Sequence, residues 1–145
     1  MLGALNQQEI EELLYSEHLG RIGCHAGGVT YIVPVSFVYD GTYIYALSAE
    51  GMKLRMMREN PSVCFEIEHV ERWYNWRTAI LWGTFEELHG EDAERAYGLL
   101  HARLTPVVEF ESRAAGRPWT QGVGTEKFVL YRIKVEERTG RFERL

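Results

Sequence analysis

Three strand-like runs of β-branched, aromatic and aliphatic residues follow one another within residues 19–49, and they leave the chain few folds to choose from. Glycine-containing breaks at Gly27-Gly28 and Asp40-Gly41 separate the runs, and such dipeptides favour tight hairpin turns. Strands joined by tight turns run antiparallel. The segment therefore predicts an antiparallel meander rather than a βαβ unit.

Three more strands are expected further along the chain. Residues 62–70 alternate apolar and polar side chains, as in a strand with one solvated face. Residues 78–88 resume the sheet after a tryptophan-rich connection at 73–76, and residues 127–142 form a last alternating run. Six antiparallel strands with peripheral helices predict a mainly β fold, a closed or partly closed barrel with few exposed strand edges.

The first helix and a short basic helix are expected between these strands. Asn6 and Glu9 have the spacing of a capping box, which predicts a helix from residue 7 to about residue 17. The segment MKLRMMREN, residues 52–60, carries apolar residues among Lys, Arg and Glu and ends before a proline.

A second long helix and a loop are expected between the last two strands. Apolar residues recur at helical spacing within residues 91–104, and Thr105-Pro106 closes this helix. Residues 105–124 lack periodicity and are rich in glycine, which predicts a long loop. Trp119 in this loop either closes over the substrate side of a ligand or anchors the loop on its own barrel.

Length and composition indicate a single globular domain over residues 1–145. Apolar residues make up 46% and charged residues 26%, as in ordinary soluble proteins. No apolar stretch approaches the ~20 residues that cross a bilayer, and the first residues do not resemble a signal peptide, so we expect a cytoplasmic protein with no membrane partner. The net charge of −5 and the lack of a long basic run argue against nucleic-acid binding.

Motifs of classical hydrolases and metalloenzymes are missing from the sequence. It holds no Gly-x-Ser-x-Gly, no His-Glu-x-x-His and no phosphate-binding loop, and its five histidines are scattered. Cys24 and Cys64 lie within strand-like runs without metal-ligand spacing, so we expect buried, reduced thiols. No metal site is expected.

One corner of the chain has the character of an anion site. Ser48 ends a hairpin, Gly51-x-Lys53 follows, and a basic helix begins. A helix N-terminus offers free N–H groups and partial positive charge, and Lys53 adds a full charge, so a phosphate monoester would be stabilised there. Alone, this pattern also fits a solvated lysine, and we expect Arg55 and Arg58 to be exposed partners of nearby acids.

The same region resembles a known family. A Pro-Val strand, a Tyr-Asp-Gly hairpin, an Ile-Tyr strand, Ser-Ala-x-Gly-x-Lys, Asn-Pro-x-Val-x-Phe, and then Thr78 and Trp82-Gly83 resemble the pyridoxamine 5'-phosphate oxidase-like split barrels, in particular the nitroimidazole-resistance-type flavoproteins. The resemblance covers about residues 5–104. It implies a six-stranded, FMN-binding split barrel and a homodimer that holds FMN in two symmetric clefts at its interface.

The resemblance also implies a set of FMN-binding residues. One strand would pass its backbone along the flavin ring, the next would meet the ribityl-phosphate end, and the corner would bind the phosphate. A later strand would supply a tryptophan that covers the cleft from either subunit and a polar side chain that reaches the flavin. In that order these residues are Val33, Pro34, Val35 and Ser36; Leu47 and Ser48; Met52 and Lys53; Trp76 and Thr78. Trp73, Tyr74 and Trp76 equally fit packing at a subunit interface.

Departures from the family pattern narrow the function. The true oxidases resemble a pattern with additional Arg and Lys residues at positions that are Tyr31, Ser36 and Met52 here, and their substrate-binding Arg and His have no convincing match, although Arg132 and Arg141 are in that region. These differences argue against oxidation of pyridoxamine phosphate. They also leave fewer charges to hold FMN.

Three functional hypotheses remain open at this point. In the first, FMN accepts a hydride from a reduced nicotinamide and reduces a small oxidised substrate, such as a nitro-aromatic or a quinone, so that no protein acid or base is indispensable. In the second, the cleft holds FMN, haem or a deazaflavin without turnover, although the spacing of His25 and His69 does not support haem ligation. In the third, the cofactor site has decayed.

Overall fold

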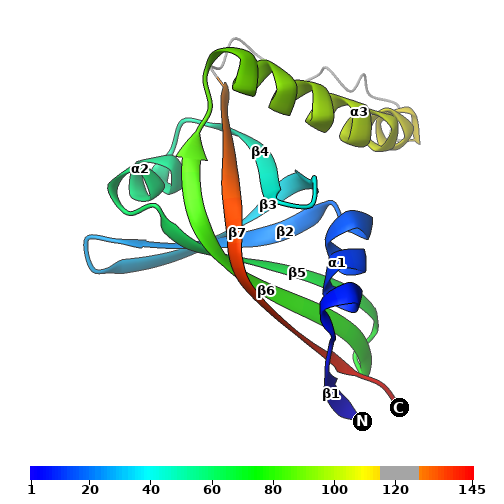
Figure 1. The fold of residues 1–145 in the computed structure, drawn as a ribbon. Helices are drawn as coiled ribbons and strands as arrows, with labels where there is room; N and C mark the ends of the chain where they lie inside the picture. Colours follow the sequence, from blue (N-terminus) through cyan, green and yellow to red (C-terminus); the bar gives the residue numbers. More distant parts are fainter. Residues whose placement is uncertain (115–127) are drawn as a thin grey trace.

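The computed structural model describes residues 1–114 and 128–145, with side chains for all of these except residues 106–114. This part of the chain forms seven strands and three helices (Figure 1). The strands are β1 (Leu2–Ala4), β2 (Leu19–Ala26), β3 (Val29–Tyr39), β4 (Tyr43–Ala49), β5 (Ser62–Arg72), β6 (Asn75–Glu87) and β7 (Phe128–Glu143). The helices are α1 (Gln7–Ser16), α2 (Met52–Glu59) and α3 (Gly90–Ala114).

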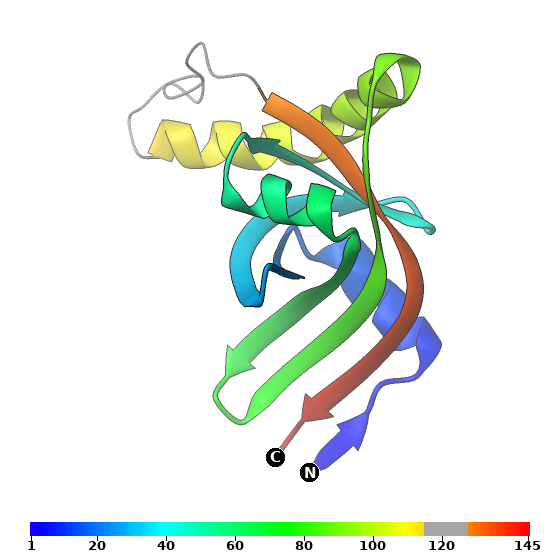
Figure 2. The ribbon, with the colours of Figure 1, turned by 90° about the vertical axis from the view of Figure 1, so that its left-hand side faces the viewer.

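The six long strands close into a ring. They pair in the order β7-β4-β3-β2-β5-β6, and β6 then pairs with β7 along most of its length. Figure 2 shows β6 (green) and β7 (orange to red) curving together through the molecule. All of these pairings are antiparallel. The expected six-stranded antiparallel split barrel is therefore confirmed, and the three-residue β1 is an addition that pairs with β7.

The barrel core follows from the alternation of side chains along each strand. Val63, Phe65 and Ile67 of β5 are buried, whereas the residues between them face outward. Phe37 of β3 is fully buried, and its ring meets that of Phe65 edge to face with centroids 5.1 Å apart. Such aromatic contacts add to the free energy gained by burying the rings themselves.

Helix α1 begins at the expected capping box. The Asn6 side chain accepts a hydrogen bond from the Glu9 backbone N–H (2.8 Å), and the Glu9 carboxylate accepts one from the Asn6 N–H (3.1 Å). The apolar stripe of this helix, Ile10, Leu13 and Leu14, is buried in the barrel core. Two orphan N–H groups at the helix start are thus satisfied while the helix packs against the barrel.

Helices α2 and α3 pack against other parts of the barrel. Leu54 and Met57 of α2 join the main core, on the side of the barrel opposite α1 (Figure 1). Helix α3 lies across the outside of β4, where Ala96 and Leu100 pack in a second apolar cluster with Tyr45. Among the described helices, none has the length and apolar character needed to cross a bilayer.

The C-terminal end of α3 corrects one expectation. The helix does not end at Thr105-Pro106 but continues to Ala114, so residues 105–114 are helical rather than part of a loop. A proline removes one helix hydrogen bond, yet its fixed φ is close to the helical value, and the residues after it include good helix formers. Residues 115–124 of the expected loop, with Trp119, lie outside the described residues.

Two smaller expectations are also corrected. The connection between β5 and β6 is shorter than expected, because Asn75 and Trp76 already belong to β6. Cys24 is buried as expected, but Cys64 is only half-buried. The two thiols face opposite sides of the sheet, since Cys24 is in phase with inward residues of β2 and Cys64 with outward residues of β5.

Candidate functional site

The ring of strands is incomplete between β3 and β4. These strands pair only where residues 37–39 meet residues 44–46. Within the described part of the chain, residues 29–36 of β3 have β2 as their only strand partner, and residues 47–49 of β4 pair only with β7. We call this opening, bounded by residues 29–36 and 47–49, the split. It leaves backbone groups of two strands available to a ligand.

The β3 edge of the split presents a particular pattern of backbone groups. Phe37 donates its N–H to the carbonyl oxygen of His18 at 2.9 Å, on the β2 side. Because successive residues of a strand turn their N–H and C=O groups to opposite edges, Ser36 and Pro34 turn theirs toward the split. Proline has no N–H and is confined to such edge positions. The edge therefore offers the Ser36 N–H as a donor and two carbonyl oxygens as acceptors.

The β4 side of the split leads directly into the N-terminus of α2. Gly51 precedes the helix without a side-chain cap hydrogen bond, and the first turn holds no acidic residue. The first N–H groups of α2 therefore lack the side-chain cap that satisfies such donors at other helix starts. Lys53 in this turn is half-buried, and burial lowers the pKa of its amine. Among the described residues, Lys53 makes no hydrogen bond or ion pair, and the Cys24 thiol partly opposes the effect of burial on the pKa of its amine.

A half-buried ammonium without an anionic partner is an uncommon feature. Burying a charge without a partner costs free energy, so such groups usually occur where a ligand supplies the opposite charge. Lys53 lies in the first turn of α2, whose start has no side-chain cap, and a cation combined with uncapped N–H donors fits a phosphate. The exposed apolar side chains of Leu47 and Met52 lie close by in the chain, as the rim of a site for a partly apolar ligand requires.

Most of the residues expected to bind a cofactor gather at this split and corner. They differ in the direction of their side chains. Pro34, Ser36, Leu47 and Met52 are exposed, Val33 and Lys53 are half-buried, and Val35 and Ser48 are buried.

The hydroxyl of Ser48 faces the interior of the barrel, where it donates to the Tyr131 hydroxyl at 3.4 Å. Only the backbone of Ser48 is therefore placed to meet a ligand at the split. Burial also raises the pKa of Tyr131 to about 12, so this pair of hydroxyls stays neutral.

Trp76 and Thr78 lie apart from the split of their own chain. The Trp76 indole donates to Glu143 at 3.0 Å, and the Thr78 hydroxyl donates to the Ile67 carbonyl oxygen at 3.2 Å. Both residues line a groove of about 380 Å³ at the β5–β6 hairpin, beside the exposed Trp73. Three strand spacings, or about 14 Å, separate β6 from β3 across the sheet. One chain alone does not bring these residues to the split.

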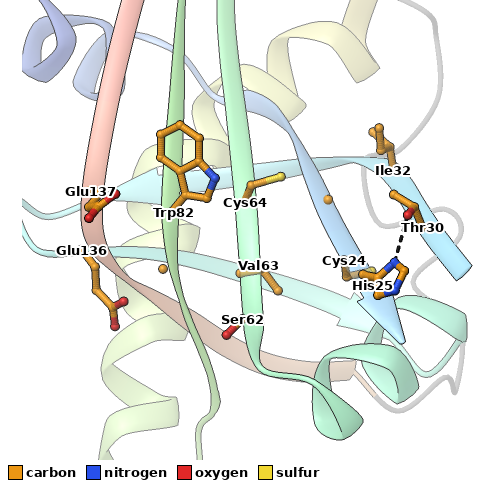
Figure 3. Close-up of a pocket in the computed structure, with 12 residues that line it drawn as sticks. Cys24, His25, Thr30, Ile32, Ser62, Val63, Cys64, Trp82, Glu136 and Glu137 are labelled. Carbon is orange, nitrogen blue, oxygen red and sulfur yellow. Dashed lines mark hydrogen bonds between the residues drawn. The ribbon is translucent and has the colours of Figure 1, made fainter. Parts of the chain in front are cut away.

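A larger pocket lies on the outer face of the sheet. It measures about 560 Å³ and is lined by residues from β2, β3, β5, β6 and β7 (Figure 3). Cross-strand pairing places Ile32, Gly23, Cys64 and Trp82 in one row along it. Beside this row, His25 shares a hydrogen bond of 2.9 Å with the Thr30 hydroxyl.

Sequence reasoning missed this outer row. Ile32 is 66% and Trp82 43% exposed, although both lie in strands with buried neighbours. The alternation of side chains along β6 could have indicated this row. Ala79 and Leu81 face the core, so Ile80 and Trp82, which alternate with them, face outward. Among the described residues, no group of three or more His, Cys, Asp or Glu side chains could hold a metal ion.

Comparison with known proteins agrees with this architecture. The sequence pattern of the pyridoxamine 5'-phosphate oxidase family matches residues 6–142. The crystal structure of an FAD-binding protein from Mesorhizobium loti superposes with a TM-score of 0.82 at 23% identity, covering 100% of this chain and 98% of that one. An FAD-binding protein from Mycobacterium smegmatis gives 0.72 at 26% identity, covering 99% and 100%.

A third solved structure shares the fold. A protein of Bacteroides thetaiotaomicron that is assigned to 5-nitroimidazole antibiotic resistance gives a TM-score of 0.69 at 17% identity, covering 98% of this chain and 87% of that one. At this identity the likeness concerns the fold. The fold is thus one that binds flavins in other proteins.

Proposed function

This chain belongs to the pyridoxamine 5'-phosphate oxidase family, and from that membership we propose that it is an FMN-binding oxidoreductase. In this proposal it passes electrons from a reduced nicotinamide to a small oxidised substrate such as a nitro-aromatic or a quinone. The observation that carries the proposal is Lys53, a half-buried cation without an anionic partner among the described residues, at a helix N-terminus beside an open strand edge.

The two ends of FMN match the two parts of the site in chemistry. A phosphate monoester needs a cation and N–H donors, which Lys53 and the first turn of α2 supply. An isoalloxazine ring needs an apolar wall with a few hydrogen bonds, which the β3 edge offers through the Ser36 N–H and the carbonyl oxygens of Pro34 and Ser36. Charge therefore favours a phosphorylated flavin over riboflavin.

The flavin supplies hydride and electron transfer when it is bound, so the protein needs no strong acid or base in the site. The chain's own residues bind the phosphate, orient the ring and limit water around it. This division of labour is consistent with the absence of a classical catalytic motif from the sequence. The cytoplasmic location we expect is where reduced nicotinamides are supplied and where thiols stay reduced.

Oxidation of pyridoxamine phosphate is not part of the proposal. Tyr31, Ser36 and Met52 provide no guanidinium or ammonium group at positions that are basic in the true oxidases. Of the two arginines in the region of the oxidases' substrate-binding residues, Arg132 and Arg141, the first is already occupied: its guanidinium donates to Glu86 at 2.9 Å and lies over the ring of Tyr43. A second phosphorylated substrate would therefore find few free cations.

We also propose that two copies of the chain form a homodimer through the outer face of the sheet. The face exposes Ile32, Ile80 and Trp82, and burial of such apolar area drives association. Trp76 and Thr78 lie far from their own split, so a second copy could supply them. Sedimentation should give a dimer, and Trp82→Glu should give a monomer. A wild-type monomer at micromolar concentration would refute this part.

The binding experiment uses FMN and riboflavin, which differ only in the phosphate. Lys53→Met should weaken FMN by ~1.5–3 kcal/mol, about ten- to a hundredfold, because a charge-assisted contact is lost. Riboflavin affinity should stay within a factor of two. Lys134→Met, which removes an exposed lysine of β7, is the matched control and should change neither. Equal affinities of wild type and Lys53→Met for FMN would remove Lys53 from the site.

Turnover is tested separately from binding. Under anaerobic conditions NADH or NADPH should bleach the absorbance of the bound flavin faster than that of free FMN, and a nitro-aromatic or quinone should restore it. Bound flavin that no nicotinamide reduces would favour a non-catalytic flavin carrier. If the protein releases FMN but retains haem or a deazaflavin, that ligand would replace FMN in the proposal. A colourless protein that lets FMN pass through would indicate another ligand or a decayed site.

A further inference from the structure

Arg58, in the last turn of α2, ties together the two ends of the corner that carries Lys53. Its guanidinium donates two hydrogen bonds to Glu50, both at 2.8 Å, and two to Glu87, at 3.0 and 2.9 Å. Glu50 lies just before Gly51 at the start of the helix, and Glu87 is the last residue of β6. We call these three side chains the Arg58 clamp.

The geometry of the clamp sets it apart from an ordinary surface ion pair. Isolated exposed pairs contribute little, but bidentate arginine–carboxylate pairs that share one guanidinium are the exception. The Arg58 hydrogen bond is the largest cause that lowers the pKa of Glu87. Arg58 also has its own pKa raised by both carboxylates. The pairing with Arg58 therefore favours the ionised form of Glu87.

The helix that presents Lys53 needs such support. It has eight residues, and isolated helices of this length are marginal in water. Gly51 at its start provides no side-chain cap, and glycine loses more backbone freedom on folding than other residues. Leu54 and Met57 hold the inner face of the helix in the core. The Arg58 clamp is the only described ion-pair network that fixes the outer face.

We propose that Arg58 is a positioning residue for phosphate binding: by joining Glu50 to Glu87 it holds the first turn of α2 and Lys53 in the geometry that receives the anion. This inference rests on the proposed function, since it assumes that the corner binds the phosphate of a flavin. Arg58 itself does not bind the phosphate, because both edges of its guanidinium are occupied by carboxylates.

Charge and geometry predict opposite results for one substitution. The clamp carries one positive and two negative charges. Glu50→Gln removes a negative charge near the corner, so an effect of charge alone would tighten FMN. The same change breaks a bidentate pair, so loss of positioning would weaken FMN. Arg58→Lys separates the two effects again, because lysine keeps the charge but has no fork that could bridge two carboxylates.

The test measures the dissociation constants of FMN and riboflavin by fluorescence titration. Arg58→Gln should weaken FMN about tenfold and riboflavin less than twofold, and Glu50→Gln and Arg58→Lys should each weaken FMN at least threefold. Arg55→Gln is the matched control, because it removes an exposed arginine from the same helix, one that makes no ion pair among the described residues. It should leave both constants within a factor of two.

Several results would overturn the inference. The inference is wrong if Glu50→Gln binds FMN more tightly than wild type, or if Arg58→Lys binds FMN with wild-type affinity. It is also wrong if Arg55→Gln weakens FMN as much as Arg58→Gln does. In each case Arg58 would act only through its charge. Equal losses for FMN and riboflavin in Arg58→Gln would indicate general damage to the site.

The Lys53→Met variant distinguishes an error in the positioning role of Arg58 from an error in the proposed function. If Lys53→Met weakens FMN and Arg58→Gln does not, only the positioning role is wrong; if neither does, the phosphate corner is wrong. A phosphorus NMR signal of bound FMN that broadens or shifts in Arg58→Gln would support the positioning role in protein that remains folded.

Discussion

Replacing Gly83 with alanine tests how tightly the barrel closes between β6 and β7. Gly83 lies where the register shifts, since Trp82 pairs with Glu137 while Gly83 pairs with Val135. A Cβ at this position would lie 2.8 Å from Ile133 Cγ2 and 3.0 Å from the Lys134 carbonyl carbon, and closer still to the Lys134 oxygen. Carbon atoms pack best at about 3.5–4.0 Å, so β7 must retreat by roughly 1 Å.

The cost follows from that displacement. A retreat of this size stretches an inter-strand hydrogen bond of about 2.9 Å beyond its useful range. Two such bonds at about 1 kcal/mol each, with ~1–3 kcal/mol for overpacking, give a loss of ~3–5 kcal/mol. For 145 residues, an unfolding entropy of about 2.1 cal/mol/K per residue gives about 0.3 kcal/mol/K, so Tm should fall by about 10–16 °C.

The assay is thermal and urea unfolding at one protein concentration, because association would shift the transition. Gly98→Ala is the matched control. Gly98 is exposed inside α3 with nothing within 4 Å of an added Cβ, so alanine should stabilise the helix by ~0.5–1 kcal/mol. A Gly83→Ala protein within about 3 °C of wild type would refute the reasoning, because it would show that the strands separate at little cost.

Two further predictions concern stability. Asn6→Ala removes one half of the capping box of α1 and should lower the free energy of unfolding by ~1 kcal/mol. The Tm should then be about 3 °C lower. An unchanged Tm would show that core packing alone holds the helix start. Burial raises the pKa values of Tyr39 and Tyr131 to about 12 from an ordinary 10, so the neutral forms stabilise the fold fully below pH 10 and that contribution is lost as the pH rises toward 12. Urea midpoints should fall across this window, and the fall should be smaller in Tyr131→Phe; an identical fall would exclude Tyr131 as its source.

Local features of the fold could be predicted from the sequence because their causes are local. The side-chain alternation around Phe65 and the capping box at Asn6 depend on near neighbours in the chain, and both were predicted. The turns at Gly27, Gly28 and Gly41 have positive φ values of 58°, 77° and 102°, which glycine adopts without strain. The continuation of α3 past Pro106 was missed, because a single proline weakens a helix without always ending it.

Residues of the candidate site also differ in whether their role follows from nearby sequence or from the complete fold. Lys53 was identified from the family resemblance and from its place at a helix N-terminus, and the second of these signals lies within ten residues of sequence. The separation of Trp76 from the split depends on the order of the strands, which only the closed ring defines. The contact of Arg58 with Glu87 joins residues 29 positions apart, so no short-range pattern could indicate it.

The split also bears on how this protein avoids assembling wrongly. Residues 29–36 are an uncovered β edge among the described strands, and such an edge can recruit a strand from another molecule. Pro34 interrupts the row of donors on that edge, so an incoming strand cannot complete a continuous ladder. The same proline leaves the neighbouring carbonyl and N–H groups accessible. In the proposed function this opening would receive the flavin while it resists strand addition, so that one residue would protect a ligand site against aggregation.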